Sequence, residues 1–265
     1  WYFGTAKIIF ILLFILPDTL LSRFQEPSSG KNYFLYGLLI PPMPFFRFLL
    51  FLLIPVSMHA QESAVGNWMM YFGNQKLSDR WNWHNEIQYR NYNFAGDLEQ
   101  LLLRTGIGYN LSANNNNLLL GYAYIHGEPY IAGTDEKTNV NEHRIFQQFI
   151  SRQQFGRFYL QHRYRIEERF IEEDFKMRFR YFLGLNVPIT KKEMVSHAVY
   201  LSLYNEIFIQ PKSPVFDRDR VYGAIGYVFS SNLKVEAGMM AQLLESSDRA
   251  QFQIAVFNTF PLMKS

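Results

Sequence analysis

The sequence predicts an all-β protein, an antiparallel up-and-down transmembrane β-barrel of about 10–12 strands. Residues 61–265 divide into segments in which apolar and polar residues alternate with the two-residue period of a β-strand. Aromatic residues make up 17% of the chain, yet its mean hydropathy is only −0.13. A bundle of transmembrane helices needs long apolar runs and would score far higher. A membrane barrel alternates lipid-facing with lumen-facing residues and reaches a near-neutral average.

Residues 43–60 have the features of a cleaved signal peptide. Met43 and Arg47 supply a start and a positive charge, a short apolar stretch follows, and Ala60 precedes the expected cleavage site. The apolar stretch is too short to cross a bilayer comfortably as a helix. We therefore expect export across the inner membrane and a mature chain that begins near Gln61.

Residues 1–42 are expected to be an upstream, non-native or unstructured segment, because a second complete start follows at Met43. A membrane anchor between Ile8 and Leu21 is the alternative, but Pro17 and Asp18 interrupt that apolar run. The predicted organisation is thus an upstream segment, a signal peptide and one barrel domain over residues 61–265.

The barrel domain contains eleven segments of strand length, separated by turn-forming residues. The segments are Asn67–Lys76, Trp81–Tyr92, Leu98–Asn110, Leu118–His126, Glu142–Gln153, Arg157–Arg169, Phe175–Val187, Val195–Gln210, Arg218–Phe229, Leu233–Leu244 and Gln251–Phe260. Each is long enough for a tilted membrane strand of about ten residues. Because single-chain bacterial barrels have even strand numbers, we expect about ten or twelve strands. Either an additional strand lies near residues 62–66 or one segment is not part of the wall.

The alternation is clearest in the second and seventh segments. Between Trp81 and Arg90, aromatic and aliphatic residues occupy one face and polar residues the other. A soluble half-buried sheet gives the same period, so a soluble periplasmic β-sheet binding protein is an alternative. The signal peptide, the number of long strands, and the Trp and Tyr residues near segment ends favour the outer membrane of a Gram-negative bacterium.

Ten charged residues are predicted to lie together as a lumen charge cluster. They are Glu86, Arg163, Arg165, Glu167, Lys176, Arg178, Arg180, Glu206, Arg218 and Arg220. Unpaired cations in a narrow interior are costly, so the carboxylates are expected to lie near the cations. A network that fills and stiffens a small lumen is the favoured interpretation. An anion-attracting passage built from the same arginines is the other.

Catalysis on lipid or lipopolysaccharide is a further alternative. His126 and His143 flank the longest predicted connection, where acidic residues could meet them. Ser196 and His197 are adjacent on a predicted strand and would point to opposite faces, which excludes a dyad. The sequence shows no metal-ligand spacing, phosphate loop or nucleotide fingerprint, so no catalytic residue, metal or cofactor is predicted. The net charge of +3 is too small to imply a nucleic-acid partner.

Short motifs follow one another in an order that is more specific than any one of them. They are Asn67-Trp68, the Lys76–Trp81 turn, Glu86–Arg90, Arg163–Arg165, Arg178–Tyr181, Asn205–Phe208 and Phe216–Arg220. This order, over nearly all of residues 65–261, resembles the family of predicted outer-membrane proteins labelled domain of unknown function 2490. The resemblance implies a signal peptide, a β-barrel and no assigned activity, and it transfers no catalytic residue. It also suggests a recurrent interior cluster of Arg178, Arg180, Glu206 and Arg220.

The expected function is therefore that of an outer-membrane barrel without enzymatic activity, with a structural or narrow transport role. The expected partners are outer-membrane lipids, lipopolysaccharide and, during insertion, the barrel-assembly machinery.

Overall fold

The structure is a computed structural model that describes residues 65–112, 115–245 and 248–262. The predicted upstream segment and the predicted signal peptide lie outside these residues. Within them, no helix combines the length and the apolar character that crossing a membrane requires.

Each of the eleven predicted segments forms a strand, with ends that differ from the prediction by at most four residues. The strands are β1 (Gly66–Lys76), β2 (Trp81–Asn91), β3 (Leu98–Asn110), β4 (Asn116–Gly127), β5 (Val140–Phe155), β6 (Phe158–Ile171), β7 (Asp174–Pro188), β8 (Val199–Ile209), β9 (Phe216–Ser230), β10 (Leu233–Leu243) and β11 (Asp248–Asn258). The largest difference is at β8, because residues 195–198 belong to the preceding turn rather than to the strand.

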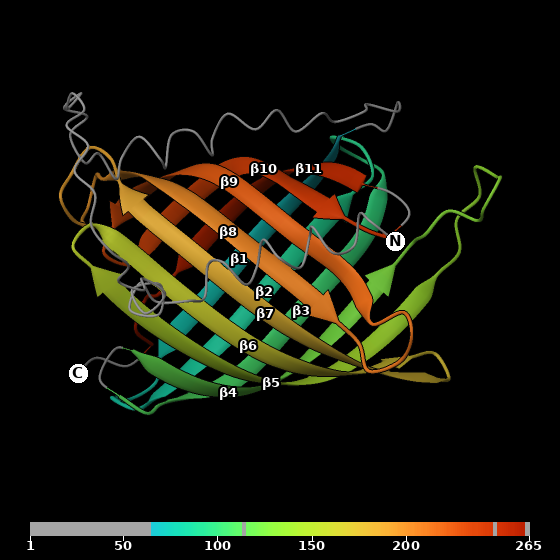
Figure 1. Cartoon of the computed structure of the whole chain (residues 1–265), viewed down its shortest axis with the longest axis horizontal. Coiled ribbons are helices and arrows are strands. Elements are labelled where there is room, and N and C mark those ends of the chain that lie inside the picture. Colours follow the sequence, from blue (N-terminus) through green and yellow to red (C-terminus); the bar gives the residue numbers. More distant parts are fainter. Residues whose placement is uncertain (1–64, 113–114, 246–247, 263–265) are drawn as a thin grey trace, which may run out of the picture. The chain divides into compact units, whose positions relative to one another are not determined.

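The strands close into a barrel in which each consecutive pair is antiparallel (Figure 1). The closing pair is β1 with β11, which run parallel from Gly66 opposite Gln251 to Gly73 opposite Asn258. The expectation of an even strand number is wrong for the described part of the chain. With eleven strands the first and last run in the same direction, and a parallel ladder still satisfies the backbone hydrogen bonds of both edges.

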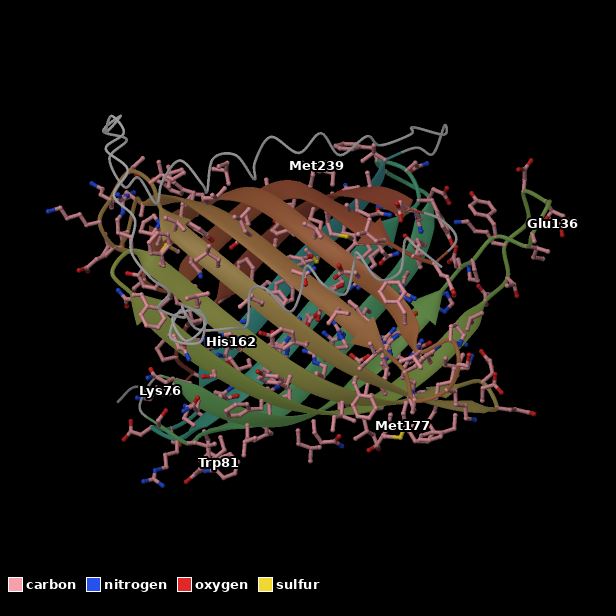
Figure 2. All side chains as sticks on the ribbon, viewed as in Figure 1. Lys76, Trp81, Glu136, His162, Met177 and Met239 are labelled. Carbon is pink, nitrogen blue, oxygen red and sulfur yellow. The ribbon has the colours of Figure 1, made fainter. Side chains whose placement is uncertain are left out.

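Two ends of the barrel follow from this topology. We call the end at which β1 and β11 finish the C-end, and the opposite end the N-end. The two-residue β5–β6 turn at the C-end uses Gly156, whose φ of 56° is one that residues with a side chain rarely adopt. The β4–β5 connection at the N-end is long and projects beyond the wall, with Glu136 near its tip (Figure 2).

The wall has an apolar outer face and a polar inner face, as the alternation predicts. In β2, Trp81 and Ile87 are exposed whereas Glu86 and Gln88 are buried. Trp81 and Met239 project from the outside of the wall in Figure 2. The strands β1 to β10 each carry at least one exposed large apolar side chain. Buried residues include far more charged and amide side chains than the core of a soluble protein normally holds.

Candidate functional site

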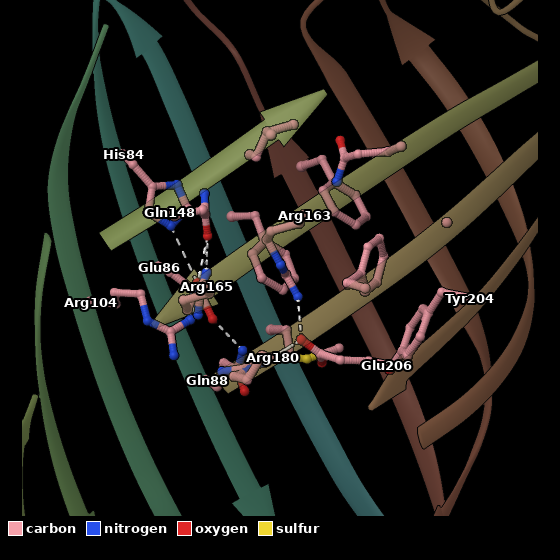
Figure 3. Close-up of a pocket in the computed structure, with 18 of the residues that line it drawn as sticks. His84, Glu86, Gln88, Arg104, Gln148, Arg163, Arg165, Arg180, Tyr204 and Glu206 are labelled. Carbon is pink, nitrogen blue, oxygen red and sulfur yellow. Dashed lines mark hydrogen bonds and ion pairs between the residues drawn. The ribbon is translucent and has the colours of Figure 1, made fainter. Parts of the chain in front are cut away.

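Two buried glutamates in the middle of the barrel, Glu167 and Glu206, bind several arginines at once. Figure 3 shows Glu206 with Arg163 and Arg180. The carboxylate of Glu167 accepts hydrogen bonds from Arg178 Nη2 and Arg180 Nη1, each at 2.6 Å. The carboxylate of Glu206 accepts from Arg180 Nη2 and Arg163 Nη2, each at 2.7 Å. Arg180 therefore links both glutamates, and strands β6, β7 and β8 are joined through one network on the inner face.

The strand register places these side chains together. Glu167 is the cross-strand partner of Arg178, and Arg165 is the partner of Arg180. Partners across an antiparallel pair lie on the same face with adjacent β-carbons, so alternating charges on β6 and β7 meet inside the barrel.

Nine of the ten residues predicted for the lumen charge cluster lie at the inner face, and Lys176 does not join them. Glu86 is buried and receives a hydrogen bond from Arg104 Nη1. Arg218 lies at the edge of the cluster, 3.1 Å from Asp217. Lys176 shares the parity of Arg178 but stands near the start of β7, where its side chain is 51% exposed. The alternation predicts on which face of the wall a side chain lies, but not at which residue along the strand the enclosed lumen ends.

The structure adds further charged residues that the predicted lumen charge cluster did not include. They are Arg90, Arg104, Glu142, Arg144, Arg152, Arg169, Asp217, Lys234 and Glu236. Alternation alone could have assigned Arg104, which lies opposite Glu86 in the register. Asp217 could not have been found in this way. It sits at a register shift between β8 and β9, where the bulge allows its carboxylate to reach Arg178 Nη1 at 3.1 Å.

Four arginines are held by the amide oxygen of a glutamine. The pairs are Arg90 with Gln88, Arg152 with Gln161, Arg165 with Gln148, and Arg220 with Gln242. An amide oxygen accepts the guanidinium hydrogen bonds as a carboxylate would, but it carries no charge. These contacts therefore fix the position of each arginine without adding a negative charge. Arg165 and Arg220 also lie 3.6 Å from Glu167 and 4.0 Å from Glu206.

Aromatic rings hold arginines in the same way. The guanidinium carbons of Arg178, Arg180 and Arg220 lie 4.4–5.2 Å from the centre of the Phe208 ring. Those of Arg90 and Arg220 lie 3.9 and 4.9 Å from the centre of the Trp68 ring. Stacking on a ring attracts a cation and keeps the guanidinium N–H edge available for another acceptor.

A cavity of about 580 Å³ lies within the barrel and extends from this network to Thr259 at the C-end. Eleven arginines and Lys234 line it. Among the described residues, the carboxylates near these cations are Glu86, Glu206 and Glu236 in the lining, Glu142, Glu167 and Asp217 behind it, and Glu99, whose charge acts on Arg90. The site is therefore a cavity large enough for water and small solutes, and its lining has a marked excess of positive charge.

The N-end carries a separate ion pair outside the wall. Lys137 of the β4–β5 connection binds Asp97, and the Tyr130 hydroxyl donates to the same carboxylate at 2.9 Å. Burial raises the pKa of Asp97, but the hydrogen bonds from Lys137 and Tyr130 outweigh it and the net shift is downward. The pair ties the long connection to the β2–β3 loop.

His126 and His143 lie near each other on the outer face of β4 and β5, where His126 Nδ1 and the Tyr124 hydroxyl both contact Asn141 Oδ1, at 3.0 and 2.8 Å. His126 Nε2 lies 3.6 Å from Glu128, and His143 packs against Tyr122 and Tyr124. His197 lies in the turn before β8, not on a strand as predicted, and its ring contacts the hydroxyl of Tyr227 at 2.8 Å. The described residues contain no group of three or more His, Cys, Asp or Glu side chains that could hold a metal ion.

The comparisons with known proteins gave one match. A family model described as a protein of unknown function (DUF2490) matches residues 65–253, which span β1 to β10 and the first part of β11. No curated protein and no solved structure matches the chain. All the residues of the predicted charge cluster fall inside the matched range. The chain belongs to the DUF2490 family.

Proposed function

We propose that this protein is an outer-membrane barrel that admits small anions into its lumen. The membrane part of the proposal rests on the outer face. Aliphatic residues such as Leu103 and Ile107 are exposed along the wall, and aromatic residues such as Trp81 and Phe155 lie at strand ends. Aromatic girdles around an apolar band are typical of outer-membrane barrels. In that setting the outer face contacts lipids and lipopolysaccharide, and the barrel-assembly machinery inserts the chain.

The anion part rests on the charge excess at the cavity. Twelve cationic side chains line it, and four arginines have an amide oxygen as the acceptor of the Nε hydrogen bond. Packing alone does not call for this excess, because a carboxylate in place of each glutamine would fill the same volume and neutralise the charge. A cavity lined by one sign of charge concentrates ions of the opposite sign. The network around Glu167 and Glu206 occupies the middle of the barrel, so the proposed passage is narrow.

Ion selectivity in planar bilayers tests the anion proposal. Arg152 and Lys234 line the cavity, and neither has a carboxylate within 4.0 Å among the described residues. In a KCl gradient we expect the wild type to be anion-selective. The double variant Arg152→Gln, Lys234→Gln should lower the ratio of chloride to potassium permeability roughly threefold, because each charge contributes to the potential of the cavity.

The matched control removes two cations that do not line the cavity. Lys176 and Lys212 are both exposed, so Lys176→Gln, Lys212→Gln should leave the permeability ratio within measurement error. Cation selectivity of the wild type, an equal change in both double variants, or the absence of any current would each contradict the proposed passage of anions.

A further inference from the structure

The Trp68 ring contacts two arginines inside the barrel, Arg90 and Arg220. We propose that Arg90 and Arg220, held on this ring, form a binding site for a divalent oxoanion, either free phosphate or the phosphate group of a small phosphomonoester. The site deepens the proposed function, since it requires anions to enter the lumen. The two guanidinium carbons lie 3.9 and 4.9 Å from the ring centre, which places them within about 9 Å of each other. Two like charges at this separation repel, and a bound anion removes that repulsion.

Within the described part of the chain, neither arginine donates a hydrogen bond to a carboxylate. Arg90 donates to the amide oxygens of Gln88 and Gln100. Arg220 donates through Nε and Nη2 to the amide oxygen of Gln242, at 3.0 and 2.9 Å. The Glu206 carboxylate is 4.0 Å from Arg220 Nη1 and already receives the shorter contacts of two other arginines.

Neighbouring donors support the same assignment independently. Trp68 Nε1, Gln253 Nε2 and the Tyr222 hydroxyl are buried and have no hydrogen-bond partner among the described residues. Trp68 lies opposite Gln253 in the β1–β11 register and packs against Tyr222 in one cluster. Buried polar groups are nearly always hydrogen-bonded, so three unsatisfied donors beside two arginines that donate to no carboxylate favour an acceptor at this place.

The chemistry of the ligand follows from these groups. Two neighbouring positive charges that donate to no carboxylate favour a ligand with two negative charges over a monovalent carboxylate. Gln88 and Gln242 already accept from the Nε–Nη2 edges of Arg90 and Arg220, so the remaining Nη hydrogens are the donors that would face the oxygens of a phosphate. Trp68, Arg90, Arg220, Tyr222 and Gln253 all line the cavity, so a small soluble phosphate that enters from the C-end reaches the site without crossing the wall.

Calorimetric titration of the full-length protein in detergent tests the site, with inorganic phosphate, glycerol phosphate and acetate as probes. We expect phosphate to bind at least tenfold more tightly than acetate. The variant Gln242→Glu keeps the size of the side chain and supplies Arg220 with a carboxylate. It should weaken phosphate binding at least tenfold while leaving the unfolding temperature unchanged or higher, because the new ion pair is hydrogen-bonded.

The control is Gln161→Glu, which adds the same charge in the lining of the cavity, beside Arg152. It should change phosphate affinity less than threefold. Equal losses of phosphate affinity in the two variants, or equally tight binding of acetate and phosphate by the wild type, would overturn the proposed site. Tighter binding of glycerol phosphate than of phosphate would assign the site to phosphomonoesters, and the reverse to free phosphate. Chloride selectivity of the same preparation in bilayers separates failure of this site from failure of the proposed function.

Discussion

Replacing Glu167 with alanine is expected to destabilise the barrel by about 3–5 kcal/mol, the cost of leaving buried charges without their partner. The Glu167 side chain is 1% exposed and accepts charge-assisted hydrogen bonds from Arg178 and Arg180. Two further arginines, Arg144 and Arg165, lie within 3.7 Å. Removing the carboxylate leaves four buried guanidinium groups around the space that it filled. Their mutual repulsion adds to the free-energy cost of the lost hydrogen bonds.

The neighbouring carboxylate supplies a matched control for this experiment. Glu168 faces outward, and it accepts a 3.4 Å hydrogen bond from Gln147. Glu168→Ala should change the free energy of unfolding by less than about 1 kcal/mol. Urea-induced unfolding in detergent micelles, followed by tryptophan fluorescence, measures both variants. Similar losses for the two substitutions would show that the interior network does not hold the fold together.

Introducing an arginine at Leu103 is expected to cost about 2–4 kcal/mol when the protein folds into a bilayer. Leu103 lies near the middle of β3 and is 40% exposed on the outer face. A cation there would be placed at the centre of the hydrocarbon layer. Phe155 is also on the surface, 59% exposed, but it is the last residue of β5. The same substitution at Phe155 should cost only about 0–1 kcal/mol, because charged groups near the interface remain hydrated.

Folding into lipid vesicles from urea provides the measurement for this pair. The informative quantity is the difference in folding free energy between the Leu103→Arg and Phe155→Arg variants, since it reports the depth of each position in the bilayer. On the surface of a soluble barrel both substitutions would fall within about 0.5 kcal/mol of the wild type, and that result would contradict the membrane proposal.

Much of the wall could be predicted from the sequence because a two-residue period is sufficient to locate strands and assign faces. The outward position of Trp83 and the inward position of Gln253 both follow from alternation. Strand number could not be predicted, because the pattern does not state how the first and last strands meet. The parallel closure of β1 with β11 pairs the backbone N–H and C=O groups of both edges, as an antiparallel pair would, with a different hydrogen-bond pattern.

The details of the site were less accessible, since they depend on the register between strands. The pairing of Gln148 with Arg165 follows from the offset of β5 on β6, and that of Gln242 with Arg220 from the offset of β9 on β10. The sequence showed the arginines on the right face but not whether a carboxylate or an amide would stand opposite each. That difference decides whether the lumen is neutral or positively charged.

The position of the tryptophans gives the most direct test of an outward apolar face in a bilayer and an enclosed polar interior. Trp81 and Trp83 are 48% and 37% exposed on the outer face, whereas Trp68 is 3% exposed inside the barrel. One variant should retain Trp68 alone and a second only Trp81 and Trp83, with phenylalanine at the other tryptophan positions. In vesicles of brominated lipids we predict strong fluorescence quenching of the second variant and little quenching of the first. Equal quenching of both, or no quenching of the Trp81 and Trp83 variant, would contradict the account.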